Sequence, residues 1–316
     1  MKKRLIVIIT IMLSMLMPIS TTMALSSVDA KEKIDITRLC SLELLYSSGE
    51  MQFDELNVQL YKVAEVSEDF QYTLIGKFAN YPISINDISS QSEWKQLSTT
   101  LNSYMLADNI SPTKTAITDH NGKAVFLDLS YGLYLVSAVD TAENNQIYHF
   151  SEFVLSIPTV NDDGKLNYSI NAKPKSIKTE PVNSQVEYEA VKLWKDSNSD
   201  KRPSSVEIAI YKNGEFQESK TLNSENNWSY FWRAVDDGSE WTVVERNIPN
   251  GYKVSIEKNA KSFVIVNTSS EKITTPPKTG DTNSKIYTIA FATLGTALII
   301  TVLIISRKRN KLNEKI

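Results

Sequence analysis

Short segments of alternating apolar and polar residues, separated by turn sequences, run through most of this chain. In residues 186–268 the segments are VEYEAVKLW, SVEIAIY, ESKTLN, WSYFWRAV, EWTVVER and KSFVIVN. Turns that end in glycine fall between them, at 212–214 (KNG), 237–238 (DG) and 250–251 (NG). About seven short strands in about 85 residues predict an antiparallel β-sandwich for this region.

Residues 31–175 carry the same strand pattern, with one exception. Examples of the strand segments are CSLELLY, NVQLYKVAEV, KAVFLDL, GLYLVSAV and EFVLSI. In SEWKQLSTTLNSYML, however, Trp94, Leu97, Leu101 and Tyr104 recur at helical spacing. We therefore predict an all-β chain of two sandwich modules in tandem, the first of which contains one inserted amphipathic helix.

Two polar stretches divide the chain further. Residues 176–185 are polar, contain Pro181 and show no periodicity, which predicts a linker between a first module at 31–175 and a second at 186–268. Residues 269–285 are also polar. We expect them to form a stalk between the second module and the C-terminal end.

Residues 1–30 have the composition of a secretory signal peptide. The basic start MKKR is followed by the apolar run LIVIITIMLSMLMPI and then by small residues, with Ala24 and Ala30 as alternative cleavage points. A retained membrane anchor is the other interpretation, but the apolar run is short for a membrane span. We expect this segment to direct export and then to be removed.

The C-terminal end has a second apolar segment. Residues 286–305 carry no charge, and about 20 apolar or small residues suffice to cross a bilayer as a helix. The tail 306–316 is rich in lysine and arginine, which places it in the cytoplasm by the positive-inside rule. The bulk of the chain is therefore expected outside the cell.

Composition narrows the classes of function. With a net charge of −3 the chain shows no basic footprint for nucleic acid, and its single cysteine, Cys40, allows no internal disulfide. His120 and His149, the two histidines, do not have the spacing of metal ligands. Because no catalytic constellation or phosphate-binding loop is visible, we expect no cofactor, no metal and no turnover enzyme.

The segment before the apolar span carries a short motif, Pro276-Pro277-Lys278-Thr279-Gly280. Motif, apolar span and basic tail follow one another as in the LPXTG class of Gram-positive cell-wall sorting signals, which this end resembles. The resemblance implies that a sortase cleaves the Thr279–Gly280 bond and passes the Thr279 carbonyl to an amine. Pro276 stands where the class has leucine, which suggests a sortase specialised for pilus assembly. The alternative is a plain tail-anchored membrane protein with a proline-rich linker.

The second module resembles a Cna B-type domain of Gram-positive pilins and adhesins. The segments that carry the resemblance are VKLWKD, KRPSSVEIAIYKNG, WTVVERNIPNGY and SFVIVNTS, in this order. In that family a lysine on the first strand forms a covalent bond with an asparagine on the last strand, assisted by a carboxylic acid. The resemblance implies that these residues are Lys192, Asn267 and Glu245.

Strand parity independently places these three polar residues on the more apolar faces of their strands. An unpaired charge is costly there, and burial lowers the pKa of a lysine and raises that of a glutamic acid. A neutral Lys192 amine can then act as a nucleophile, with a protonated Glu245 as acid and base. The alternative is a buried Lys192–Glu245 ion pair with Asn267 beside it.

The first module resembles, more loosely, the N-terminal domain of sortase-assembled pilins, through VQLYKVAEV, GKAVFLDLSYGLYLV and EFVLSIP. Such pilins carry a lysine after a proline near the domain end, which receives the threonine of the next subunit. Lys175 in NAKPKSIK is the best match and Lys173 a weaker one, although the aromatic residue of the family motif is absent. A solvated linker lysine is the alternative. We identify no isopeptide triad in this module.

The cysteine and a row of aromatic residues are each interpreted as part of the core rather than as a functional site. Cys40 lies on a predicted strand on the same face as leucines, which indicates a small buried hydrophobe rather than a reactive thioester. Trp228, Tyr230 and Trp232 alternate along one strand. Their shared parity indicates an inward face rather than a ligand platform.

These features predict a secreted, cell-wall-anchored pilin subunit of a Gram-positive bacterium with a structural and adhesive role. Its expected partners are a sortase, other pilin subunits, a peptidoglycan precursor and host matrix or surface ligands, with the membrane holding it before processing. The alternative is a stand-alone adhesin that does not polymerise. The two differ in whether an acceptor such as Lys175 is needed.

Overall fold

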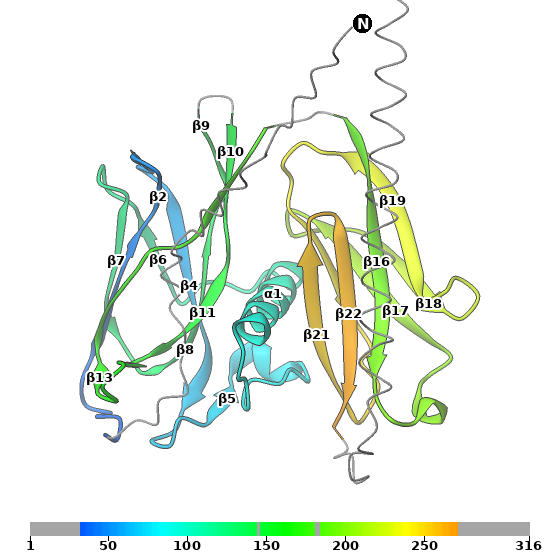
Figure 1. Cartoon of the computed structure of the whole chain (residues 1–316), viewed down its shortest axis with the longest axis horizontal. Coiled ribbons are helices and arrows are strands. Elements are labelled where there is room, and N and C mark those ends of the chain that lie inside the picture. Colours follow the sequence, from blue (N-terminus) through cyan, green and yellow to red (C-terminus); the bar gives the residue numbers. More distant parts are fainter. Residues whose placement is uncertain (1–31, 144–145, 181–183, 271–316) are drawn as a thin grey trace, which may run out of the picture. The chain divides into compact units, whose positions relative to one another are not determined.

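The computed structural model describes residues 32–143, 146–180 and 184–270. The predicted signal peptide, sorting motif, apolar span and basic tail lie outside these ranges. Within them, strands dominate, together with one α-helix, α1 (Gln91–Ala107), and two short 3-10 helices, η1 (Gly76–Asn80) and η2 (Ser199–Lys201) (Figure 1). The predicted all-β class with one inserted helix is confirmed. None of the helices in the described ranges is long and apolar enough to cross a membrane.

The described residues between 32 and 179, called the first region below, contain fifteen strands, most of them short; residues 184–270 are called the second region. They are β1 (Cys40–Leu45), β2 (Ser47–Ser48), β3 (Met51–Gln52), β4 (Asn57–Val66), β5 (Tyr72–Leu74), β6 (Lys114–Ile117), β7 (Lys123–Leu129), β8 (Gly132–Ala138), β9 (Thr141–Glu143), β10 (Gln146–Phe150), β11 (Phe153–Ile157), β12 (Thr159–Val160), β13 (Leu166–Asn167), β14 (Ser169–Ala172) and β15 (Ser176–Thr179). The five segments given as examples correspond to β1, β4, β7, β8 and β11.

Two sheets of this region enclose a hydrophobic core. One has the order β14-β1-β7 and the other β11-β8-β4-β5, with β6 also paired to β4. Leu42, Phe126, Leu60 and Val136 from these sheets belong to one buried cluster. A further sheet, β15-β10-β9, includes residues 176–179 of the predicted linker, because their backbone pairs with β10.

The second region holds seven strands. They are β16 (Gln185–Lys195), β17 (Ser205–Lys212), β18 (Glu215–Asn223), β19 (Ser229–Val235), β20 (Trp241–Glu245), β21 (Tyr252–Asn259) and β22 (Ser262–Ser269). They form two sheets, β19-β16-β22-β21 and β18-β17-β20. The prediction of a wholly antiparallel sandwich is wrong in one respect, because the first strand, β16, pairs with the last strand, β22, in parallel. Strand β21 was not among the predicted segments.

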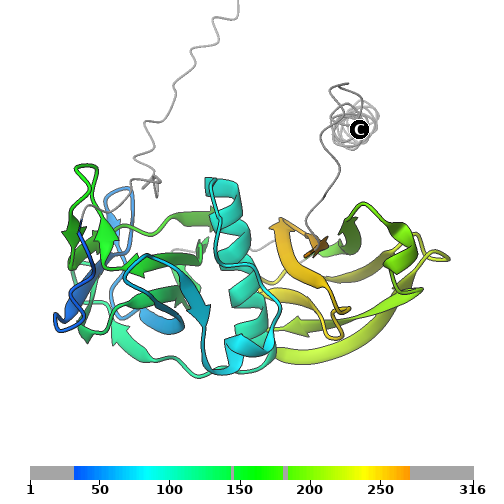
Figure 2. The same ribbon diagram turned by 90° about the horizontal axis from the view of Figure 1, so that it is seen from below.

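Helix α1 begins with a capping box, in which the side chains of Ser90 and Glu93 each accept a hydrogen bond from the other residue's backbone. From Leu97 to Ala107 every residue except Leu106 is buried. The polar side of the predicted amphipathic helix is therefore not left to solvent. The helix contacts β8 and β11 of the first region and β20 and β21 of the second (Figure 2).

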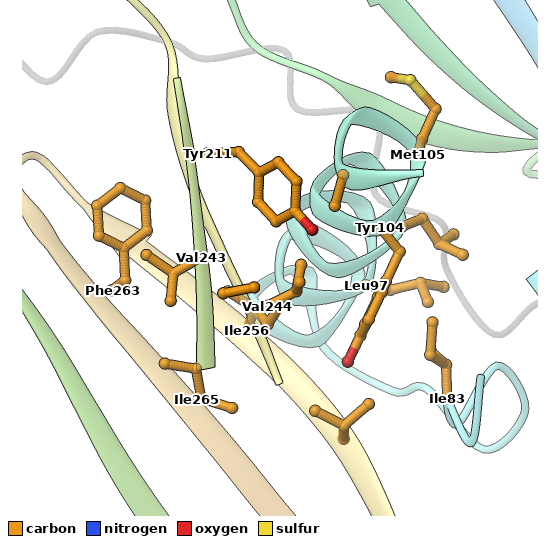
Figure 3. Close-up of a cluster of buried hydrophobic side chains, with 14 of the residues drawn as sticks. Ile83, Leu97, Tyr104, Met105, Tyr211, Val243, Val244, Ile256, Phe263 and Ile265 are labelled. Carbon is orange, nitrogen blue, oxygen red and sulfur yellow. The ribbon is translucent and has the colours of Figure 1, made fainter. Parts of the chain in front are cut away.

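A single hydrophobic cluster runs through this helix from one region into the other. Leu97, Tyr104 and Met105 of α1 lie in the same buried cluster as Val244 and Ile256 of the second region (Figure 3). The described residues up to Ser270 accordingly form one compact unit.

Candidate isopeptide site

The parallel pairing of β16 and β22 brings two of the predicted residues together. In this register Lys192 lies opposite Ile265, and Trp194 lies opposite Asn267. Because side chains alternate along a strand, Lys192 and Asn267 point to the same face of the sheet, one step apart on a diagonal. That face is turned toward the core of the second region, where Ile265 is fully buried.

Glu245, the third predicted residue, comes from the other sheet. It is the last residue of β20, a strand in which all five residues are buried. Its side chain meets the other two, since Asn267 Nδ2 donates to Glu245 Oε1 over 3.0 Å and Lys192 Nζ lies 3.5 Å from Glu245 Oε2. Lys192 is 2% exposed and the other two residues 0%, so the three polar groups lie together in the interior.

Lys192 is held mainly by backbone carbonyls rather than by the carboxyl group. Its Nζ donates to Leu193 O over 3.0 Å and to Ile265 O over 3.4 Å. The distance of 3.5 Å to Glu245 Oε2 exceeds that of an ordinary charge-assisted hydrogen bond, which is about 2.8 Å. The amine also lies 4.3 Å from the centre of the Trp194 ring. This arrangement differs from a tight buried ion pair.

Two oxygen atoms at the centre of the site have no hydrogen-bond partner among the described residues, Glu245 Oε2 and Asn267 Oδ1. Buried polar atoms are nearly always paired, so two such atoms within one triad need an explanation. Rotation of the Asn267 amide by half a turn places Oδ1 where Nδ2 now contacts Glu245. A protonated Glu245 can then donate a hydrogen bond to the amide oxygen.

Burial drives the protonation of the pair toward the neutral forms. Desolvation lowers the pKa of Lys192 to about 8, although Glu245 opposes the shift. Desolvation likewise raises the pKa of Glu245, against the effect of Lys192. A neutral amine and a neutral carboxylic acid are the states that nucleophilic attack on an amide requires.

Aromatic residues and one ion pair cover the site on the side of Trp194. The Trp194 ring meets Trp228 and Tyr252 edge to face, at centroid distances of 5.6 and 5.1 Å. The Tyr252 hydroxyl donates to Asp196 over 2.8 Å, and Asp196 also accepts from Arg202. These contacts keep water away from the Lys192 amine.

The other predicted residues lie apart from this triad. Lys175 and Lys173 are both exposed, in the segment between β14 and β15, and the Lys175 carbonyl accepts a hydrogen bond from Ser151 N–H over 3.0 Å. The motif Pro276-Pro277-Lys278-Thr279-Gly280 lies outside the described residues. Within the described ranges, no group of histidine, cysteine, aspartate and glutamate side chains is arranged to hold a metal ion.

The structure agrees with the predictions that Cys40 is a small buried hydrophobe and that Trp228, Tyr230 and Trp232 face inward. Cys40 is 2% exposed on β1 and belongs to the core of the first region. Trp228, Tyr230 and Trp232 are partly buried and pack against the core of the second region.

One contact to the site was missed by reasoning from the sequence. Tyr104 of helix α1 donates its hydroxyl hydrogen to the backbone carbonyl of Glu245 over 2.9 Å. The sequence marks Tyr104 only as one apolar position of a helix, 141 residues before Glu245. No local pattern connects the two residues.

Comparison with known proteins agrees with the geometry. A family model for the Cna protein B-type domain matches residues 188–268. These residues form a Cna B-type domain. The chain is also 24% identical, over 144 residues, to the collagen adhesin of Staphylococcus aureus, a match that covers 40% of this chain and 12% of the adhesin. The chain thus spans only a small part of that relative.

Several solved structures of Gram-positive surface proteins show low similarity. A single B repeat unit of the collagen-binding surface protein of S. aureus is 16% identical, with 74% of this chain and 99% of that chain covered and a TM-score of 0.26. The major pilin SpaD of Corynebacterium diphtheriae is 16% identical, with 75% and 67% covered and a TM-score of 0.29. The minor pilin GBS52 of Streptococcus agalactiae is 17% identical, with 76% and 100% covered and a TM-score of 0.26. At TM-scores this low, the likenesses decide neither the fold nor the function.

Proposed function

We propose that this chain is a pilin-type surface subunit whose Cna B-type domain is closed by an isopeptide bond between Lys192 and Asn267. The observation that carries the proposal is the fully buried triad in which a lysine, a carboxyl group and an asparagine meet, with two oxygen atoms that accept no hydrogen bond from any described residue. A purely structural ion pair between Lys192 and Glu245 would not explain why Asn267 Oδ1 is buried without a hydrogen-bond partner in the described part of the chain.

The proposed reaction needs no external reagent. The neutral Lys192 amine attacks Cγ of Asn267, while Glu245 donates a proton to the amide oxygen. Glu245 then takes a proton from the attacking amine and passes it to Nδ2, so that the Cγ–Nδ2 bond breaks and the nitrogen leaves as ammonia. The proton on the amide oxygen returns to Glu245 as the carbonyl group re-forms, which leaves Glu245 protonated as at the start. The product is one new amide bond between Lys192 Nζ and Asn267 Cγ. The reaction takes place once per molecule, so it is not enzyme turnover.

The position of the bond suits a load-bearing chain. It would join β16, through which the chain enters the second region, to β22, through which it leaves. Tension between the two ends of the domain would then pass through the new bond and bypass strands β17 to β21. A chain held in this way resists both stretching and proteolysis.

Sortase linkage through Thr279 is the second part of the proposal. It rests on the order of motif, apolar segment and basic tail in the sequence. Lys175 is the proposed acceptor, and its exposure beside β15 leaves it accessible to a partner. A stand-alone adhesin that is anchored through Thr279 without polymerising is the second candidate. Binding to a host matrix ligand belongs to either candidate.

Intact mass of the processed chain tests the isopeptide bond. We expect the wild type to weigh one ammonia less than its sequence, and Glu245→Gln, which keeps the size of the side chain but removes the acid, to have the full sequence mass. A wild-type chain at its full sequence mass would exclude the bond.

Denaturing gels of cell-wall extracts distinguish the two candidates. A polymerising subunit gives high-mass ladders that disappear in Lys175→Ala, while Lys173→Ala serves as the matched control and keeps them. Ladders that persist in Lys175→Ala would refute its role as acceptor. A single wall-linked species without ladders would support the stand-alone adhesin.

A further inference from the structure

Helix α1 of the first region lies against the strand that carries Glu245, and we infer that Tyr104 is a positioning residue for the proposed cross-linking reaction. The inference deepens the proposed function and rests on it. It assigns to the first region a part in a reaction whose three reacting residues all belong to the second.

The backbone around Glu245 explains why a partner is needed there. Strand β20 is the edge of the sheet β18-β17-β20, so only one of its sides pairs with a strand. Arg246 N–H donates to Glu207 O on β17 over 3.1 Å. Because adjacent residues in an antiparallel strand point their backbone groups to opposite sides, the Glu245 carbonyl faces away from β17. The Tyr104 hydroxyl meets it there at 2.9 Å.

Tyr104 is itself held firmly. The residue is 0% exposed, and its ring stacks on Tyr81 with 4.0 Å between the centroids. Burial raises the pKa of Tyr104, and the nearby charge of Glu245 raises it further. The hydroxyl therefore stays protonated and remains a donor to the Glu245 carbonyl at any pH at which the protein works.

Two further contacts fix β20 on either side of Glu245. Before the strand, Asn102 Nδ2 of α1 donates to Glu240 Oε1 over 3.2 Å. After it, Arg246 Nη1 donates to Asp108 Oδ1, just beyond the helix end, over 2.6 Å. The helix thus holds the strand before, at and after the acid. A displacement of about 1 Å at a reacting group can slow a reaction by about 100-fold, so loss of the central contact should slow the cross-link.

A neighbouring residue of the same helix provides a matched control. Thr100 Oγ1 accepts a hydrogen bond from Ile256 N–H on β21 over 2.8 Å, an edge strand that carries none of the three reacting residues. Thr100→Val removes a buried hydroxyl from the same interface, as Tyr104→Phe does. A loss of interface stability alone would affect the reaction equally in both variants.

The test follows the rate of cross-linking in the full chain. The chain is synthesised in a short cell-free pulse, denatured at timed intervals and digested, and the branched peptide that joins Lys192 to Asn267 is quantified by mass spectrometry. We expect Tyr104→Phe to slow its formation by about 10- to 100-fold while the final yield stays at the wild-type level. Thr100→Val should remain within about twofold of the wild type, because its strand carries no reacting residue.

The outcomes separate this inference from the function on which it rests. A wild-type rate in Tyr104→Phe, or equal slowing in Tyr104→Phe and Thr100→Val, would overturn the positioning role alone. A wild-type chain that never forms the branched peptide would overturn both. If Tyr104→Phe fails to fold, Tyr104→Met removes the same hydroxyl with a more adaptable side chain, and a wild-type rate in that variant would equally refute the inference.

Discussion

The two regions of this molecule share a parallel pair of strands, but the side chains that the pair buries are apolar in the first region and partly polar in the second. In the first region β1 pairs with β14 in parallel, as β16 pairs with β22 in the second. By register, Leu42 and Ala172 of the first region have the same diagonal offset as Lys192 and Asn267 have in the second. One parallel pair is closed by apolar packing, and the other presents a buried amine to a buried amide.

This difference shows that the topology permits a cross-link but does not create one. The apolar strand pair of the first region, β1 and β14, needs no acid, and its Leu42 is 0% exposed within an ordinary hydrophobic core. The polar version places three groups in the interior whose burial is costly unless they react or pair well. The proposed reaction would remove this cost in the second region.

The largest expected effect follows from losing the bond in the second region. The bond would close a loop of about 75 residues, and by analogy with a disulfide its loss should cost about 4–5 kcal/mol of unfolding free energy. Glu245→Gln should lower the midpoint of urea unfolding accordingly. Four of the five tryptophans lie in the second region, so their fluorescence reports on it. Equal midpoints for wild type and variant would contradict the bond.

Transplanting the polar pair tests whether strand arrangement alone suffices. Leu42→Lys combined with Ala172→Asn reproduces the amine and the amide in the first region without a buried acid. We expect no loss of ammonia and a destabilisation of about 3–5 kcal/mol, because an unpaired charge is buried. Intact mass and far-UV circular dichroism during thermal unfolding measure the two outcomes. A cross-link in this variant would show that the acid is dispensable.

The two sides of helix α1 offer a smaller test of how the regions are joined. Ser98 Oγ accepts from Val154 N–H on β11 at 3.1 Å, and Thr100 Oγ1 accepts from Ile256 N–H on β21 at 2.8 Å. Each hydroxyl covers an edge strand of a different region, so Ser98→Ala and Thr100→Val should each cost about 1–3 kcal/mol. Hydrogen exchange should rise at Val154 in the first variant and at Ile256 in the second. Exchange that rises at neither amide would contradict this account.

The smallest expected effect is a pH dependence of the cross-linking rate. The reactive pair holds one proton, with Lys192 neutral and Glu245 protonated. Above the pKa of Lys192, about 8, the pair loses this proton and the acid is gone. Below the raised pKa of Glu245 it gains a second proton, and the amine is no longer a nucleophile. We expect a bell-shaped profile in which the rate falls about twofold near pH 8 and continues to fall above it. A rate that rises steadily to pH 10 would show that Glu245 does not act as an acid.

Much of the second region was predictable because its signals are local. Alternation placed Lys192, Glu245 and Asn267 on inward faces, and the resemblance to Cna B-type domains assigned their roles. The parallel pairing of β16 with β22 was not predictable, since strand order depends on contacts between residues far apart in the sequence. Strand β21, by contrast, was predictable but was missed: its segment YKVSIEKN alternates apolar and polar residues, and Tyr252, Val254 and Ile256 are buried.

The first region was less predictable in its long-range contacts. The spacing of Trp94, Leu97, Leu101 and Tyr104 predicted a helix with one buried side. Its serine, threonine and asparagine residues from Ser98 onward are nevertheless buried too, and Ser98 and Thr100 accept hydrogen bonds from edge strands of the two regions. A polar residue on a helix is normally expected to face solvent, and only the tertiary structure reveals a second partner.

The most direct test of the account is a peptide map of the mature wild-type protein, denatured and digested before mass spectrometry. We predict a branched peptide in which Lys192 Nζ is joined to Asn267 Cγ with the loss of one ammonia, absent from Glu245→Gln. Separate linear peptides, with an unmodified Lys192 and an intact Asn267 amide, would contradict the central claim.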